Sequence, residues 1–126
     1  MTLVDSVGWI EFFTDGPLAR EYSKYLQRPA EVLVPTLVIY EVYKKIKAAR
    51  NEESALVAVA TMQSGRVLPL TDDLSLSAAD LSLDHKLAMA DAVVYASALE
   101  ENAELVTSDS DLKNLPHVTY LPFPRS

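Results

Sequence analysis

Short apolar runs alternate along the chain with longer stretches of mixed apolar and polar residues. The short runs, which predict strands, are residues 1–5, 32–34, 66–70, 104–106 and 118–121. The longer stretches, which predict helices, are residues 7–13, 18–27, 36–50, 51–62, 71–80 and 87–101. Strands that are apolar throughout and alternate with helices are typical of a parallel sheet covered on both faces. The pattern therefore predicts an α/β fold, and we expect a single domain over residues 1–126.

The stretch 87–101 is apolar or small through Leu99 except for one charge, Asp91. No residue three or four positions from Asp91 in a helix is basic, so the carboxylate has no local partner. A helix that is apolar on all sides is usually buried, and a buried unpaired charge is costly. The strand that follows leads into Thr107, Asp109 and Asp111. A buried helical acid followed by a strand that ends in acids indicates a metal site.

Two further acids extend this pattern. Asp5 and Asp109 follow predicted strands, whereas Glu41 and Asp91 lie on helices that can pack over the same edge of the sheet. Two carboxylates 4 Å apart repel each other by about 4 kcal/mol at an effective dielectric near 20, so such a cluster needs protons or cations. Oxygen ligands favour Mg²⁺ or Mn²⁺ over zinc. The reaction class that follows is metal-assisted hydrolysis of a phosphodiester.

Composition excludes several other kinds of site. The chain has no cysteine, which rules out disulfides, thiolate metal sites and cysteine nucleophiles, and its three glycines cannot form a glycine-rich phosphate loop. No apolar run reaches the roughly 18–20 residues that span a membrane, and the N-terminus lacks a signal-peptide pattern. We therefore expect a cytoplasmic protein without membrane contacts. The formal net charge of −7 does not favour nucleic-acid binding by itself.

The chain resembles the PIN domain, specifically the VapC-type toxin ribonucleases, nearly from end to end. The matching segments are Val4-Asp5-Ser6, Leu37–Val42 with Glu41, Leu87–Ala92 with Asp91, and Leu105–Leu112 with Thr107, Asp109 and Asp111. The resemblance implies a three-layer α/β/α fold and a Mg²⁺- or Mn²⁺-dependent endoribonuclease toxin. It also implies an RNA substrate, inhibition by a cognate antitoxin protein, and a homodimer, for which Trp9, Phe12 and Phe13 offer apolar surface.

The resemblance makes Asp5, Glu41, Asp91 and Asp109 the catalytic and metal-binding acids, with Asp111 as a further metal carboxylate. Ser6 and Thr107 are supporting hydroxyls that hold a carboxylate or a metal-bound water. On a helical wheel Lys44 and Lys45 lie within about 60° of Glu41, so these two lysines are the candidate RNA-binding residues.

Most of these residues also have a purely structural interpretation. Asp5 can cap the next helix, although Ser6 can serve instead, and Asp109 can be a turn residue. Glu41 can pair with Lys44 or Lys45 at helical spacing. Asp111 is either a metal carboxylate or a cap for residues 112–114, and the hydroxyls of Ser6 and Thr107 can simply satisfy the backbone. Asp91 alone has no such local role.

Other functions fit the sequence less well. A phosphatase that forms an aspartyl phosphate on Asp5 usually has a second acid two residues later, where this chain has Val7. A phosphate-accepting receiver domain needs paired acids near the first strand and a lysine after a late strand, and neither is evident. The remaining alternative is a non-catalytic PIN-like module that binds RNA or protein, and the presence of all four acids favours the enzyme.

Overall fold

The structure is a computed structural model that describes residues 1–125. The strands are β1 (Thr2–Val4), β2 (Val32–Pro35), β3 (Arg66–Leu68), β4 (Glu104–Thr107) and β5 (Val118–Tyr120). The helices are α1 (Ser6–Thr14), α2 (Ala19–Ser23), α3 (Thr36–Ala49), α4 (Glu52–Met62), α5 (Asp72–His85) and α6 (Met89–Glu100), with the 3-10 turns η1 (Pro29–Glu31) and η2 (Ser110–Leu112). None of the helices within residues 1–125 is long and apolar enough to cross a membrane.

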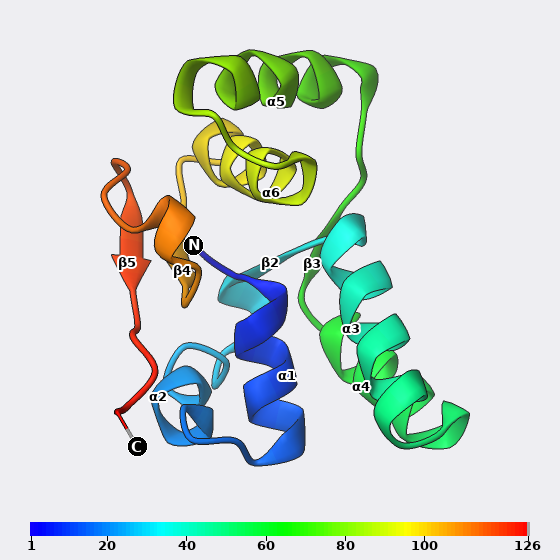
Figure 1. Ribbon diagram of the computed structural model, residues 1–126. Coiled ribbons are helices and arrows are strands. Elements are labelled where there is room, and N and C mark those ends of the chain that lie inside the picture. The colour runs from blue at the N-terminus through cyan, green and yellow to red at the C-terminus, as the bar shows by residue number, and fades with distance from the viewer. Residues whose placement is uncertain (126) are drawn as a thin grey trace.

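The strands form one sheet in the order β3-β2-β1-β4-β5, and every neighbouring pair is parallel. Leu3, Leu33 and Leu105 on its three central strands have no exposed surface. In Figure 1, α5 and α6 lie above the sheet, α1 and α2 lie below it, and the α3–α4 hairpin stands to the right. α3 contacts both α1 and α6. The predicted α/β fold with a central parallel sheet, in three α/β/α layers, is therefore confirmed.

The position of α6 explains its unusual composition. This helix lies between the sheet and α5 (Figure 1), and every residue from Ala92 to Ala98 is buried. A helix covered on two sides has little solvent-facing surface, which is why the segment carries so few polar residues. Asp91 lies in the first turn of α6, just before this buried stretch.

Several helix ends differ from the sequence prediction. Asp5, not Ser6, caps α1, because its side chain accepts a hydrogen bond from the Ser6 N–H at 2.7 Å. The helix predicted over residues 18–27 shortens to α2, since the backbone beyond it makes three-residue turns. α5 continues past Asp80 to His85, and it ends where Lys86 adopts a left-handed conformation with φ of 56°.

Candidate active site

The five acids that the sequence singled out come from four segments of the chain around the carboxyl edge of the sheet: the end of β1, α3, α6 and the segment after β4. Asp5 directly follows β1, and Asp109 lies two residues after β4, its neighbour in the sheet. Glu41 lies on α3, Asp91 in the first turn of α6, and Asp111 in η2. Asp91, Asp109 and Asp111 bring carboxylate oxygens within 4.8 Å of one another, and the charge of Asp5 acts on both Asp91 and Glu41, so the expected convergence is present. We refer to these five residues together as the acid cluster.

Asp5 is buried at the centre of this arrangement, with 6% of its surface exposed. Its Oδ1 accepts the Ser6 N–H at 2.7 Å, and its Oδ2 accepts the hydroxyl of Thr107 at 2.8 Å. Burial raises the pKa of Asp5, these two hydrogen bonds oppose the rise, and the negative charge of Asp109 adds to it. Both carboxylate oxygens are thus fixed in orientation by the neighbouring chain, and the helix-cap role and the place in the cluster coexist.

Residues 107–111, which we call the acid loop, fold by side-chain hydrogen bonds to the backbone. The Thr107 hydroxyl accepts the Asp109 N–H at 3.0 Å, and Asp109 Oδ1 accepts the Asp111 N–H at 2.9 Å. Asp109 is therefore a turn residue as well as a member of the cluster. Because Thr107 also donates to Asp5, a single hydroxyl connects the ends of β1 and β4.

Asp91, Asp109 and Asp111 form the tightest group in the cluster. Each offers a carboxylate oxygen, and these oxygens all lie within 4.8 Å of one another. The pKa of Asp91 is raised to about 7, first by burial, then by its contact with Asp109 and by the negative charges of Asp109, Asp5 and Asp111. A carboxyl group whose pKa is shifted close to physiological pH is frequent at functional sites.

Glu41 joins the cluster through Asp5, whose charge acts on it. Burial raises the pKa of Glu41, the negative charge of Asp5 raises it further, and a hydrogen bond from Ser6 lowers it. The alternative pairing with a lysine is absent from the described part of the chain, where the ion pairs are Lys24–Glu21, Arg28–Glu31, Lys47–Glu52 and Arg66–Glu101. None of these pairs includes an acid of the cluster, so its negative charges are without basic partners in residues 1–125.

Comparison with known proteins identifies the family to which this arrangement belongs. The family model of the PIN domain matches residues 2–118. The chain belongs to the PIN domain family. No curated protein matches it in sequence.

Solved structures similar to this PIN domain include toxins. A toxin–antitoxin complex from Klebsiella pneumoniae matches with a TM-score of 0.80 at 22% identity, over 94% of this chain and 96% of that one. Mycobacterium tuberculosis VapC20, a toxin that cleaves the sarcin–ricin loop, matches with a TM-score of 0.74 at 18% identity, over 88% and 92%. VapBC2 from Rickettsia felis, bound to a DNA fragment from its promoter, matches with a TM-score of 0.74 at 12% identity, over 98% of each chain. Because these structures are at most 22% identical in sequence to this chain, the similarity shows a shared fold.

The acid cluster of this PIN domain is suited to a hard divalent cation. Its charged groups are all carboxylates, and three of them bring oxygens within 4.8 Å of one another. Mg²⁺ and Mn²⁺ prefer such oxygen ligands, whereas zinc more often takes nitrogen and sulfur. The raised pKa values of Asp5, Glu41 and Asp91 indicate that negative charge is poorly neutralised here, which a bound cation would correct.

Sequence reasoning missed two residues that support the site, Tyr22 and Ser108. Tyr22 has no exposed surface, and its hydroxyl shares a 2.5 Å hydrogen bond with the hydroxyl of Ser108 in the acid loop. Burial raises the pKa of Tyr22 to about 12, the hydrogen bond with Ser108 lowers it, and the charge of Asp5 raises it. The ring crosses the first turn of α1 at Gly8, where an added Cβ would overlap Tyr22 and Val4. A glycine inside the predicted helix 7–13 was the available sequence signal.

Proposed function

We propose that this PIN domain is a VapC-type toxin, an endoribonuclease that uses Mg²⁺ or Mn²⁺ to hydrolyse RNA phosphodiester bonds and that a cognate antitoxin inhibits. The observation that carries the proposal is the gathering of five carboxylates from four segments of the chain, with the pKa of Asp91 raised to about 7. The toxins among the similar structures support it, since one of them cleaves the sarcin–ricin loop and another is a toxin–antitoxin complex.

In this proposal Asp5, Glu41, Asp91 and Asp109 hold the metal, and Asp111 is a further ligand. When bound, the divalent ion supplies Lewis-acid stabilisation of the charge that develops on the phosphodiester. The chain itself fixes the ligands beforehand: Thr107 and the Ser6 backbone orient the two oxygens of Asp5. This preorganisation is what keeps a loop-borne site accurate enough for catalysis.

Asp91 also has a role in the protein without metal. With a pKa of about 7, its carboxyl group is protonated in about half of the molecules at neutral pH, which reduces the repulsion among the acids. The hydroxyls of Ser6 and Thr107 add neutral hydrogen bonds to Glu41 and Asp5. These features allow the fold to tolerate the cluster when no metal is bound.

Two lysines of α3 are proposed to contact the RNA. Lys44 and Lys45 follow Glu41 by three and four residues, both are exposed, and neither forms an ion pair within residues 1–125. Such a cation can meet a phosphate next to the one that is cleaved, while bound metal supplies further positive charge. The same rim is available to a basic antitoxin side chain that enters the cluster in place of metal. We further propose a cytoplasmic location, where both the RNA and an antitoxin are accessible.

The proposal is tested with purified protein and a single-stranded RNA in Mg²⁺, Mn²⁺ or EDTA. We expect cleavage with either metal and none in EDTA. The alternative function, a non-catalytic PIN-like module, predicts RNA or protein binding without cleavage under any of the three conditions. The product of a neighbouring reading frame, added in equal amount, should abolish the cleavage if it is the antitoxin. Intact RNA at all metal concentrations, in a preparation that is folded by circular dichroism, would reject the ribonuclease.

A further inference from the structure

Lysine side chains lie over tyrosine rings on both sides of the acid cluster. One pair is on α3, which follows β2, and the other is on the segment that runs from η2 into β5. The sheet order places β1 and β4, whose ends carry Asp5 and Asp109, between β2 and β5. Figure 1 shows α3 and β5 on opposite sides of this central part of the sheet. A strand of substrate that crosses the acids would therefore pass both pairs.

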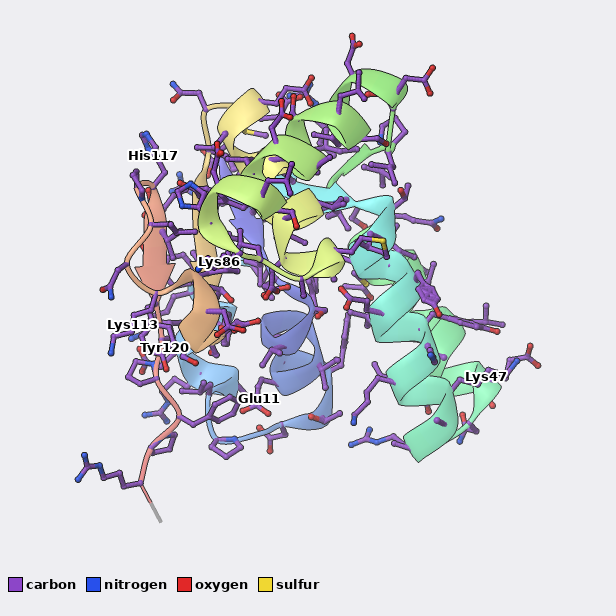
Figure 2. All side chains as sticks on the ribbon, turned by 45° about the horizontal axis from the view of Figure 1, so that its top comes forward. Glu11, Lys47, Lys86, Lys113, His117 and Tyr120 are labelled. Atoms are coloured by element: carbon purple, nitrogen blue, oxygen red, sulfur yellow. The ribbon has the colours of Figure 1, made fainter. Side chains whose placement is uncertain are left out.

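The pair on the β5 side adjoins the acid loop. Lys113 follows Asp111 by two residues, and its Nζ lies 5.6 Å from the centre of the Tyr120 ring. Tyr120 is paired in register with Thr107 across β4 and β5, and the Leu121 N–H donates to the Thr107 carbonyl at 2.8 Å. Figure 2 shows Lys113 and Tyr120 close together on the η2 side of the ribbon. An exposed cation and a half-exposed ring are thus attached to the element that supplies two of the acids.

The pair on the α3 side adjoins Glu41. Tyr40 immediately precedes Glu41 and is 52% exposed, an unusual position for so large an apolar ring. The Nζ of Lys44 lies 5.6 Å from the centre of this ring and 3.5 Å from its hydroxyl. Tyr40 and Lys44 are one helical turn apart, so they share a face of α3 that borders Glu41.

A third pair on the same helix has the same chemistry in a different setting. The Nζ of Lys47 lies 5.3 Å from the centre of the Tyr43 ring, but Lys47 also contacts Glu52 of α4 at 3.6 Å. It lies nearly two turns beyond Glu41, and Figure 2 places it at the outer end of the α3–α4 hairpin. Lys47 and Tyr43 therefore provide a matched control, because they match the other pairs in composition and differ in position and in charge pairing.

The combination of a free cation and an accessible ring fits single-stranded nucleic acid in particular. A lysine binds the phosphate, and an aromatic ring stacks on a base whatever its identity. Lys44 and Lys113 make no ion pair in the described residues, although the molecule has a formal net charge of −7 and acids are abundant. An uncharged protein partner would gain little binding energy from two lysines that lie far apart. A polyanion that spans both pairs would instead contact each lysine with a phosphate.

We propose that Tyr40–Lys44 and Lys113–Tyr120 are two nucleotide subsites on either side of the cleaved phosphate, so that single-stranded RNA crosses the acid cluster from one pair to the other. The proposal rests on the ribonuclease function proposed above, and it adds the substrate form, an unpaired strand, and three residues, Tyr40, Lys113 and Tyr120. Each lysine holds one flanking phosphate, and each ring stacks on the base of the adjoining nucleotide.

The test measures RNA affinity as a function of salt in an uncleaving Asp91→Asn protein with Mn²⁺, by fluorescence anisotropy of a labelled single-stranded RNA. Lys44→Ala and Lys113→Ala should each flatten the logarithmic salt dependence by about 0.7, the value for one phosphate contact with a single strand. Tyr40→Leu and Tyr120→Leu should weaken binding by about tenfold at every salt concentration with an unchanged slope. Lys47→Ala and Tyr43→Leu should change neither quantity.

Several results would overturn this path. One is a logarithmic salt slope that is unchanged in Lys113→Ala. Another is a slope that Lys47→Ala flattens as much as the other lysine substitutions do. Because Lys113 and Tyr40 are exposed, their variants are expected to fold even if Tyr120→Leu does not. Normal RNA binding by the lysine variants together with lost antitoxin binding would assign the pairs to the protein partner instead. Metal-dependent cleavage by the unsubstituted protein, measured alongside, separates the two proposals: if cleavage occurs and the slopes do not change, the path alone is wrong.

Discussion

Asp91 lies half-buried in the first turn of α6, and its charged neighbours are the carboxylates of Asp5, Asp109 and Asp111. Its isolation was visible in the sequence, because it is the one charge between Leu87 and Leu99 and no basic residue lies three or four positions away. Tyr22 was not visible in the same way. Its partner Ser108 is 86 residues away, and an aromatic residue in an amphipathic stretch is most simply read as core. Local chemistry can be predicted from neighbouring residues, but a hydrogen bond between distant segments needs the fold.

The raised pKa of Asp91 predicts a pH-dependent stability of the metal-free protein. The folded-state pKa of about 7 lies above the ordinary value of 3.8, so between these values the folded protein binds more protons than the unfolded chain. Its free energy of unfolding should therefore fall as the pH rises from about 4 to about 7. Asp91→Asn should flatten this fall, by about 1 kcal/mol at most because water screens the half-exposed group.

The measurement is thermal melting in EDTA at pH 5 and pH 8. Asp91→Asn should melt no lower than the unsubstituted protein at pH 8, and its melting temperature should differ less between the two pH values. Asp80→Asn, at an exposed position of α5, is the control. If Asp91→Asn lowered the melting temperature, relative to the unsubstituted protein, more at pH 8 than at pH 5, the assigned pKa would be contradicted.

The hydroxyl of Tyr22 is predicted to position the acid loop. Tyr22→Phe keeps the ring in place but removes the hydrogen bond to Ser108, so the loop acids should be held less accurately. We expect the Mn²⁺ concentration for half-maximal thermal stabilisation to rise by about 10- to 100-fold, as is typical when a supporting partner of metal ligands is lost. Tyr95→Phe is matched to it, since it also removes a buried tyrosine hydroxyl, one that donates to the Pro116 carbonyl at 2.9 Å.

Both variants should lose a similar free energy of unfolding, about 0.5–1.5 kcal/mol for one hydrogen bond. The distinction lies in the metal response, which Tyr95→Phe should leave unchanged. If both variants needed the same Mn²⁺ concentration for half-maximal stabilisation, Tyr22 would have a structural role only and would not position the acid loop.

At the scale of elements, the order of strands and helices was predictable and several of their ends were not. Apolar runs identified the five strands, because parallel strands covered on both faces have little polar surface. The end of α5 was predicted too early: nothing in the sequence between Asp80 and His85 marks a continuation, and the end depends on the left-handed conformation of Lys86. The cap of α1 was assigned to Ser6 although Asp5 provides it. The sequence does not distinguish an acid that only follows a strand from one that also caps the next helix.

The first turn of α1 is predicted to tolerate no side chain at residue 8. An added Cβ would overlap the Tyr22 ring and the Val4 side chain. Gly8→Ala should therefore destabilise the protein by about 1–3 kcal/mol, the usual effect of overpacking, although alanine favours helix over glycine. In a Tyr22→Leu background the loss should be smaller, because the larger of the two obstacles is reduced. Urea unfolding of the four proteins measures this coupling, and purely additive losses would show that Tyr22 is not the obstacle.

At the scale of the whole molecule, the net charge of −7 pointed away from RNA, and the arrangement of charge changes that interpretation. Five of the acids are gathered in one cluster suited to a cation, and it is flanked by Lys44 and Lys113, which form no ion pair within residues 1–125. The convergence itself followed from the topology, since acids at the ends of neighbouring parallel strands must meet at one edge. The Tyr40–Lys44 contact follows from helical spacing alone, but the position of that face beside the acids depends on the packing of α3, and the Lys113–Tyr120 contact depends on the pairing of β5.

The apolar surface available to the expected homodimer is smaller than the sequence indicated. Trp9 stacks on Phe13 and is only 4% exposed, and Phe13 is itself partly buried, so Phe12, at 36%, is the most exposed of the three aromatic residues. We still expect a dimer in solution. Light scattering at micromolar concentration should give about twice the 13.9 kDa mass of one chain, and Phe12→Ser should shift the mass towards that of the monomer. A monomeric mass for the unsubstituted protein would reject the dimer.

The central claim is that the acids act as one metal-holding unit for RNA cleavage, and the rate of cleavage in Mn²⁺ by single and double variants tests it most directly. Glu41→Gln and Asp91→Asn should each slow cleavage by more than about 100-fold, since even supporting partners of metal ligands contribute about 10- to 100-fold. The double variant should be about as slow as either single one, because residues that work as a unit have non-additive effects. Asp80→Asn should cleave normally. A folded Asp91→Asn protein that cleaves RNA at the unsubstituted rate would contradict the account.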